Sequence, residues 1–226
     1  MARILGFCLL LALALSACSD EPAAGIYGTE GGWGTLQISA GKLHINANGS
    51  NGHGCTVDAQ RQDGSWQTEV LDATACRLSF KFLGQGRWTV SGEPMEACRA
   101  FCGARANFQG DYVALPAGCT PPQQRLRHDA ALRLYAAQRY GQAQATMTSL
   151  ASECAVYLDW REKYSLANDQ AITAWHLGDL VACRQLSASV INEEQLELLR
   201  QVAPSDYESY KPRVDAARFN FRRCGG

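Results

Sequence analysis

Cysteine is the residue type in this chain with the clearest chemical meaning. The eight cysteines that follow residue 50 are Cys55, Cys76, Cys98, Cys102, Cys119, Cys154, Cys183 and Cys224. An even number of cysteines in an exported chain favours disulfides. A zinc site needs closely spaced ligands, whereas only Cys98 and Cys102 lie close together and the four histidines are scattered singly. We therefore predict four disulfides, no metal and no other cofactor.

These cysteines form two groups, one in each half of the chain. Four lie before residue 103 and four lie at or after Cys119, so we expect two disulfides in each half. Eight cysteines allow 105 pairings, and the spacing leaves the pairing of the first group open. In the second group we predict the pairs Cys119–Cys154 and Cys183–Cys224.

The first residues carry an export signal. Arg3 precedes an apolar run from Ile4 to Leu15, which is too short to span a bilayer but fits the apolar region of a secretory signal. The following Leu-Ser-Ala-Cys18 resembles the lipobox of bacterial lipoproteins. That resemblance implies a signal peptide over 1–17, fatty acyl chains such as palmitate on Cys18, a linker over 18–24 and anchoring to the membrane. Serine after Cys18 favours the periplasmic face of the outer membrane; a plain signal peptide is the alternative.

Residues for catalysis are sparse. The chain has no G-x-S-x-G, H-E-x-x-H or phosphate-loop motif, so we predict no catalytic residue. His53 stands between two glycines as a candidate base or binding residue, although a solvated loop position explains it equally. Arg105 is predicted to lie beside a disulfide and to brace backbone carbonyls locally, with the binding of an acidic ligand as the alternative.

Charge excludes one class of partner. The chain has 21 basic and 22 acidic side chains, and a nucleic-acid binder needs a surplus of positive charge to displace counterions from phosphates. We expect no nucleic-acid partner.

Two kinds of periodicity divide the rest of the chain. Residues 25–115 are rich in glycine, with short alternating runs every eight to twelve residues, which predicts a small antiparallel sheet, barrel or sandwich. A short helical turn is expected over 98–103, followed by a last edge strand near 107–113. The candidate core aromatics, for which a carbohydrate platform is the alternative, are Tyr27, Trp33, Trp66, Phe80, Phe82 and Trp88.

After a proline-rich segment at 116–122, the apolar spacing over 123–226 becomes helical. We predict helix breaks at 139–141 and 178–179, and a final helix over 205–223 with Pro212 in its first turn or at a kink. Tyr140-Gly-Gln-Ala143 aligns with Leu180-Val-Ala-Cys183 at an offset of 40 residues. This pattern resembles a degenerate tetratricopeptide repeat; a plain disulfide-braced pair of helical hairpins is the alternative. The expected fold class is α+β, with a β domain followed by a TPR-like helical domain.

The mature chain also resembles a type of bacterial lipoprotein. The segments that carry the resemblance are Gly49-Ser-Asn-Gly-His-Gly-Cys55, Cys98-Arg-Ala-Phe-Cys-Gly-Ala-Arg-Ala106, and Asn168-Asp-Gln-Ala-Ile172 before His176-Leu-Gly-Asp179. The resemblance supplies no activity. We expect a non-catalytic protein-binding module with a partner in the cell envelope, for example an inhibitor of a lysozyme-type hydrolase. The alternatives are an assembly factor of the outer membrane and an enzyme acting on peptidoglycan or polysaccharide.

Overall fold

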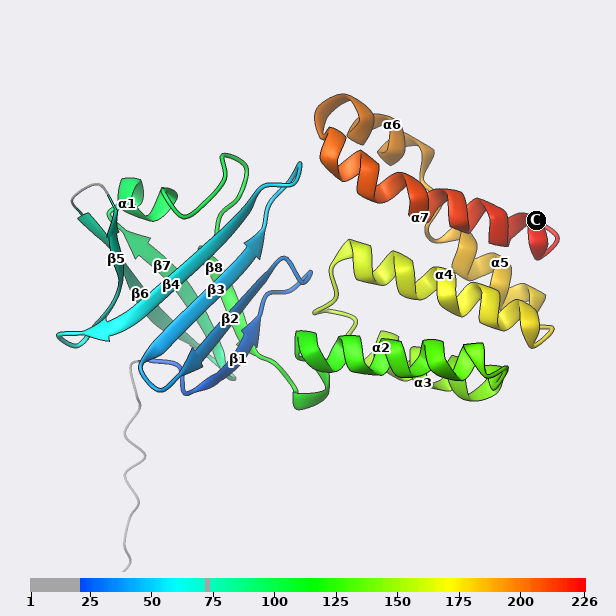
Figure 1. Ribbon diagram of the computed structural model, residues 1–226, viewed down its shortest axis with the longest axis horizontal. Coiled ribbons are helices and arrows are strands. Elements are labelled where there is room, and N and C mark those ends of the chain that lie inside the picture. Colours follow the sequence, from blue (N-terminus) through cyan, green and yellow to red (C-terminus); the bar gives the residue numbers. More distant parts are fainter. Residues whose placement is uncertain (1–20, 72–73) are drawn as a thin grey trace, which may run out of the picture.

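The computed structural model describes residues 21–71 and 74–226. Within them, eight antiparallel strands close into a barrel that is followed by a group of helices (Figure 1). The predicted signal peptide and Cys18 lie outside the described residues. The strands are β1 (Gly25–Gly28), β2 (Gly34–Ser39), β3 (Lys42–Asn48), β4 (Gly54–Gln62), β5 (Ser65–Leu71), β6 (Thr74–Gly84), β7 (Arg87–Glu93) and β8 (Gly110–Ala114).

Strand β3 shows how alternation builds the barrel. Leu43, Ile45 and Ala47 point inward and are at most 2% exposed, while the residues between them are exposed. The register places Ile45 opposite Leu36 of β2 and Val57 of β4. Because these three side chains are all fully buried, the interior at this level is filled by side chains.

The prediction of a last edge strand is wrong. Strand β8 pairs with β7 on one side and with β1 on the other, where Tyr27 lies opposite Ala114. Strand β1 was not predicted because it has only four residues with glycine at both ends, which is too short for alternation to show. The β1–β8 pairing closes the barrel and occupies the backbone groups that an edge would leave open.

The predicted aromatic core is largely present. Three of its members are at most 6% exposed, namely Tyr27, Trp66 and Trp88. Trp33 and Phe80 are partly buried against the same cluster. The prediction is wrong for Phe82, which is 55% exposed. Alternation along β6 suits an inward position, but Phe82 lies near the end of the strand and covers Trp88, with ring centroids 4.8 Å apart.

Both barrel disulfides fasten the segment that follows β7. This segment holds the short helix α1 (Met95–Arg99), which begins three residues before the predicted helical turn. Cys98 of α1 is bonded to Cys76 of β6, and Cys102 is bonded to Cys55 of β4. The segment therefore lies against the barrel wall.

The helices follow a 3-10 turn at Ala117–Cys119. They are α2 (Pro121–Ala136), α3 (Tyr140–Glu153), α4 (Trp160–His176), α5 (Leu180–Ala188), α6 (Glu193–Val202) and α7 (Pro204–Arg223). Helices α2 and α3 pack as one hairpin and α4 and α5 as a second, α3 contacts α4, and α7 packs on α4, α5 and α6. The two predicted helix breaks are confirmed. Pro212 lies in the interior of α7 and not in its first turn.

Two barrel loops contact the helices. In the β1–β2 loop, the Gly31 amide donates to the Val156 carbonyl at 2.7 Å. In the β3–β4 loop, the Asn51 amide donates to an Asp206 carboxylate oxygen at 2.6 Å, and the Asn51 side-chain oxygen accepts from the Ser205 amide at 2.9 Å. These bonds join the barrel to the α3–α4 connection and to the start of α7.

Candidate functional site

A hollow that combines an apolar floor with charged groups lies in the helical part. It is an open cavity of about 210 Å³ between α2, α4 and α7, hereafter the groove. Its floor is formed by Leu150, Leu158 and Leu166, each 3% exposed. Its polar lining is formed by Gln124, Arg125, His128, Arg161, Glu162, Ser165 and Arg213.

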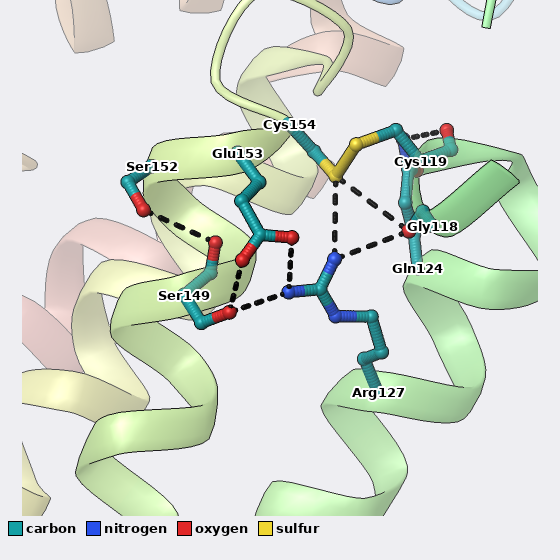
Figure 2. Close-up of a disulfide and its surroundings, with 8 residues drawn as sticks. All are labelled: Gly118, Cys119, Gln124, Arg127, Ser149, Ser152, Glu153 and Cys154. Atoms are coloured by element: carbon teal, nitrogen blue, oxygen red, sulfur yellow. Dashed lines mark hydrogen bonds and ion pairs between the residues drawn. A yellow bond between two sulfur atoms is a disulfide. The ribbon is translucent and has the colours of Figure 1, made fainter. Parts of the chain in front are cut away.

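The Cys119–Cys154 disulfide holds the helices that build one wall of the groove (Figure 2). It joins the turn before α2 to the residue after α3. Arg127 fills the space beside it and donates to the Gly118 carbonyl at 3.2 Å and to the Ser149 hydroxyl at 2.7 Å. An ion pair to Glu153 at 2.9 Å completes this arrangement. Arg127 therefore serves the α2–α3 junction and is not a lining residue of the groove.

Helix α4 begins at a capping box that orients two lining residues. The Asp159 carboxylate accepts from the Glu162 amide and the Glu162 carboxylate accepts from the Asp159 amide, each at 2.8 Å. Arg161 donates to Asp159 at 3.4 Å and to Asp206 of α7 at 3.1 Å. The charge of Arg161 is thus balanced by two carboxylates.

Arg213 of α7 has a different environment. Its guanidinium donates to the Arg161 carbonyl at 3.1 Å, to the Ser165 hydroxyl at 3.1 Å and to the Ser209 carbonyl at 2.5 Å. All three acceptors are uncharged. Burial, followed by repulsion from Arg161, lowers the pKa of Arg213. A positive charge is therefore held at the groove without a carboxylate partner among its hydrogen bonds.

Arg125 and His128 extend the positive side of the groove onto α2. Arg125 is exposed at the rim. His128 Nε2 lies 2.7 Å from Asp169 of α4, and the hydrogen bond to Asp169 is the main cause that raises the pKa of His128. Burial raises the pKa of Glu162, which is the one acidic side chain in the lining. The groove can accept an anionic group above an apolar floor.

The two residues singled out from the sequence lie elsewhere. Arg105 Nη1 donates to the Val202 carbonyl at the end of α6 at 2.8 Å. It braces a carbonyl, but one in the helical part and not a local one. His53 packs against Gly103, whose added Cβ would meet its ring at 2.5 Å. The structure does not bring His53 or Arg105 into the groove.

All eight described cysteines are paired. The helical part contains Cys119–Cys154 and Cys183–Cys224, as the sequence predicted, and the barrel contains Cys55–Cys102 and Cys76–Cys98. In residues 21–71 and 74–226, no group of three or more histidine, cysteine or acidic side chains is placed to hold a metal ion. Nor does any helix of this part of the chain combine the length and apolarity needed to cross a bilayer.

Sequence reasoning missed the groove because its polar lining comes from three helices, α2, α4 and α7, that are separated in the chain. One local signal was available. Asp159 and Glu162 have the spacing of a capping box directly before an apolar helix, which marks the start of α4. That signal identifies the end of the helix at which Arg161 lies, but not its neighbours Arg125 and Arg213.

No protein-family model, curated protein or solved structure matches this chain. Its function is therefore inferred from the chemistry of the groove.

Proposed function

We propose that this protein is a non-catalytic binding module of the bacterial envelope whose helical groove holds an acidic segment of a partner protein. The observation that carries the proposal is the lining of the groove. Arg125 and Arg213 supply positive charge above a floor of three buried leucines. A segment that presents a carboxylate beside an apolar side chain would satisfy both features.

The way the helices pack supports the same conclusion. Ala143 and Cys183, the small residues of the TPR-like alignment, are both fully buried, and the hairpins α2–α3 and α4–α5 lie side by side. We propose that they are two TPR-like units capped by α7. Tandem helical hairpins build extended surfaces that bind protein segments.

Membrane attachment belongs to the same proposal. The lipobox-like residues before Cys18 support acylation and a place at the periplasmic face of the outer membrane. Several acyl chains anchor a protein firmly where one chain is marginal. Mass spectrometry of the mature chain tests this: acyl mass on the peptide that begins at Cys18 is expected, and an unmodified Cys18 would contradict it.

A charge reversal tests the groove. The intact chain is used to capture its partner from the envelope, the partner is identified by mass, and the purified pair is titrated. Arg125→Glu is expected to weaken binding at least tenfold, because a carboxylate then faces the acidic segment. Lys163→Glu is the matched control, since Lys163 is exposed on α4 outside the groove lining. Equal affinities for both variants would contradict the proposal.

One concrete version is inhibition of a muramidase. If a lysozyme-type hydrolase is the partner, the intact chain inhibits the turnover of peptidoglycan in proportion to its concentration, and Arg125→Glu relieves this inhibition. Inhibition that Arg125→Glu leaves unchanged would place the contact on another surface. An assembly partner in the outer membrane would instead be captured without any effect on muramidase activity.

A further inference from the structure

The end of the helical part that points away from the barrel has an unusual surface. We call it the distal end and define it by residues 137–140, 177–184 and 219–226, which are the α2–α3 turn, the α4–α5 region and the end of α7 (Figure 1). Tyr140 stacks on His176 with ring centroids 4.2 Å apart, and the Cys183–Cys224 disulfide joins α5 to α7. These contacts hold the three segments together as one surface.

Apolar side chains are exposed at this end. Leu177, Leu180 and Val181 fall within five residues and are 48%, 42% and 57% exposed, and Phe219 of α7 is 53% exposed. Gly178, with a φ of 78°, makes the turn between them, and Asp179 uses its carboxylate to cap α5. Scattered exposed apolar residues are ordinary, but a group of them beside polar residues marks an interaction surface.

The charges at the distal end are mostly positive. Its three segments contain the arginines Arg139, Arg184, Arg222 and Arg223, and Asp179 is their one acidic side chain. Arg139 and Arg222 are exposed. Arg223 lies over the Trp175 ring at 3.9 Å, and Arg184 donates to the Cys224 carbonyl at 2.9 Å. None of the four is ion-paired to a carboxylate in the described part of the chain.

We propose that the distal end docks on a bilayer surface that carries anionic headgroups. Guanidinium groups bind phosphate oxygens in a forked geometry and are attracted to the negative surface of such a bilayer. The exposed leucine, valine and phenylalanine side chains of the same segments can enter the boundary between headgroups and acyl chains. The combination of both on one tip favours a lipid surface over a soluble polyanion, which would leave the apolar side chains in water.

This surface is separate from the groove. The groove is lined by Arg125, Arg161 and Arg213, none of which lies in the distal segments. Membrane contact at the distal end therefore adds a second function. The test of this membrane contact depends neither on binding in the groove nor on acylation.

Sedimentation with vesicles tests the proposal. The chain over residues 21–226 contains the whole described fold and lacks Cys18, so lipidation cannot contribute. It is expected to sediment with vesicles of phosphatidylcholine and phosphatidylglycerol, but not with phosphatidylcholine alone. Arg139→Gln with Arg222→Gln is expected to weaken partitioning about 25-fold, at about fivefold for each arginine. Leu180→Ser with Val181→Ser is expected to weaken it about tenfold.

Two controls separate this surface from others. Val156→Ser changes an apolar side chain that is 54% exposed in the α3–α4 connection, and Arg125→Glu changes the groove; neither is expected to alter vesicle binding. Circular dichroism confirms that each variant is folded. No binding to anionic vesicles overturns the proposal. So does binding that only the arginine changes weaken, because the apolar side chains would then make no contact with the bilayer.

Discussion

The barrel and the helical part are stabilised in different ways. The barrel has one cluster of 17 buried apolar residues. The helical part has separate clusters of eight and four, and five more buried apolar residues lie outside them, namely Val190, Ala203, Tyr210, Val214 and Ala217. Alanine and cysteine make up much of the two smaller clusters, and small side chains bury little apolar area. We therefore expect the stability of the barrel to come mainly from its apolar core. The helical part should also require disulfides and buried hydrogen bonds.

Buried hydrogen bonds supply part of those connections. Asn168 of α4 donates to the Arg213 carbonyl at 2.9 Å, and Asn220 of α7 donates to the Asn168 carbonyl at 3.3 Å. Both side chains are at least 90% buried. Buried hydrogen bonds of this kind fix the relative position of α4 and α7 without a large apolar interface. Because hydrogen bonds contribute to its packing, the helical part relies less on apolar surface and can leave a charged groove exposed.

Removing disulfides gives the largest expected effect and tests this difference directly. Each bridge closes a loop of 22 to 47 residues, so each contributes about 3–4 kcal/mol by restricting the unfolded chain. Replacing all four cysteines of one part by alanine thus removes a similar amount from either part. We expect the helical part to unfold and the barrel to remain folded after its own four cysteines are replaced.

Two spectroscopic signals report the outcome separately. The helical signal in the far ultraviolet follows α2 to α7. In a chain that also carries Trp160→Phe and Trp175→Phe in α4, the near-ultraviolet signal of the buried Trp66 and Trp88 follows the barrel. Loss of the tryptophan signal in the barrel variant, with the helical signal retained in the other, would reverse the comparison.

A glycine at the junction gives the next largest effect. Gly32 has a φ of 67°, and an added Cβ would lie 2.5 Å from the Tyr157 carbonyl oxygen in the α3–α4 connection. Gly32→Ala should therefore strain the backbone and also force the barrel loop away from the helices. Gly64, with a φ of 80° and open space around it, is the matched control. Gly64→Ala should cost about 1 kcal/mol.

Thermal unfolding and amide exchange measure the difference between the two variants. We expect Gly32→Ala to lower the free energy of unfolding by at least about 2 kcal/mol more than Gly64→Ala, with faster exchange at the Gly31 amide. Equal destabilisation would show that the loop can move aside without loss.

The sequence predicts the individual strands of the barrel better than it predicts the closure of the barrel. Alternation such as Leu43, Ile45 and Ala47 is a local pattern, so most strands were predictable. The two-residue period does not tell whether a sheet closes, because closure depends on the pairing of β1 with β8 at opposite ends of the barrel sequence. Because β1 has glycine at both ends, it also lacks the alternation that predicts a strand.

The candidate site was less predictable than the fold. The two groups of cysteines indicated that bridges form within each half of the chain, although four cysteines in one half still allow three pairings. Arg125, Arg161 and Arg213 come together only after three helices pack, and single arginines on helices are ordinary surface residues. Arg105 was singled out correctly as a brace, but its partner Val202 lies in the other part of the molecule.

Removing the side chain of Asn51 is expected to have a smaller effect on the contact between the barrel and the helical part. Its oxygen accepts from the Ser205 amide at the start of α7, in the manner of a helix cap. Asn51 has a φ of 57°, so Asn51→Gly removes the side-chain bond without straining the backbone. We expect a loss of about 1 kcal/mol, measured by urea unfolding, with faster exchange of the Ser205 amide. Unchanged exchange at Ser205 would show that the bond contributes nothing.

The smallest expected effect is the pH dependence of stability at His128 in the helical part. The pKa of His128 is raised, first by its hydrogen bond to Asp169 and then by the charges of Asp169, Asp129 and Glu162, while burial opposes the shift. Protonated His128 therefore stabilises the folded state fully below its unfolded pKa of about 6.5. This stabilisation is lost as the pH rises through the higher folded pKa.

The helical part should thus be less stable at pH 8.5 than at pH 6, by less than about 1 kcal/mol because the pair is partly exposed. His128→Gln should remove this dependence. Burial also raises the pKa of Glu162, so its ionisation lowers stability from about pH 4.5 upward; Glu162→Gln separates the two contributions. In the barrel, His44 and Asp58 form an exposed pair with 45% and 77% of their side chains accessible. His44→Gln should leave the free energy of unfolding of the barrel unchanged, because an exposed ion pair contributes little to stability; a measurable loss would contradict this expectation.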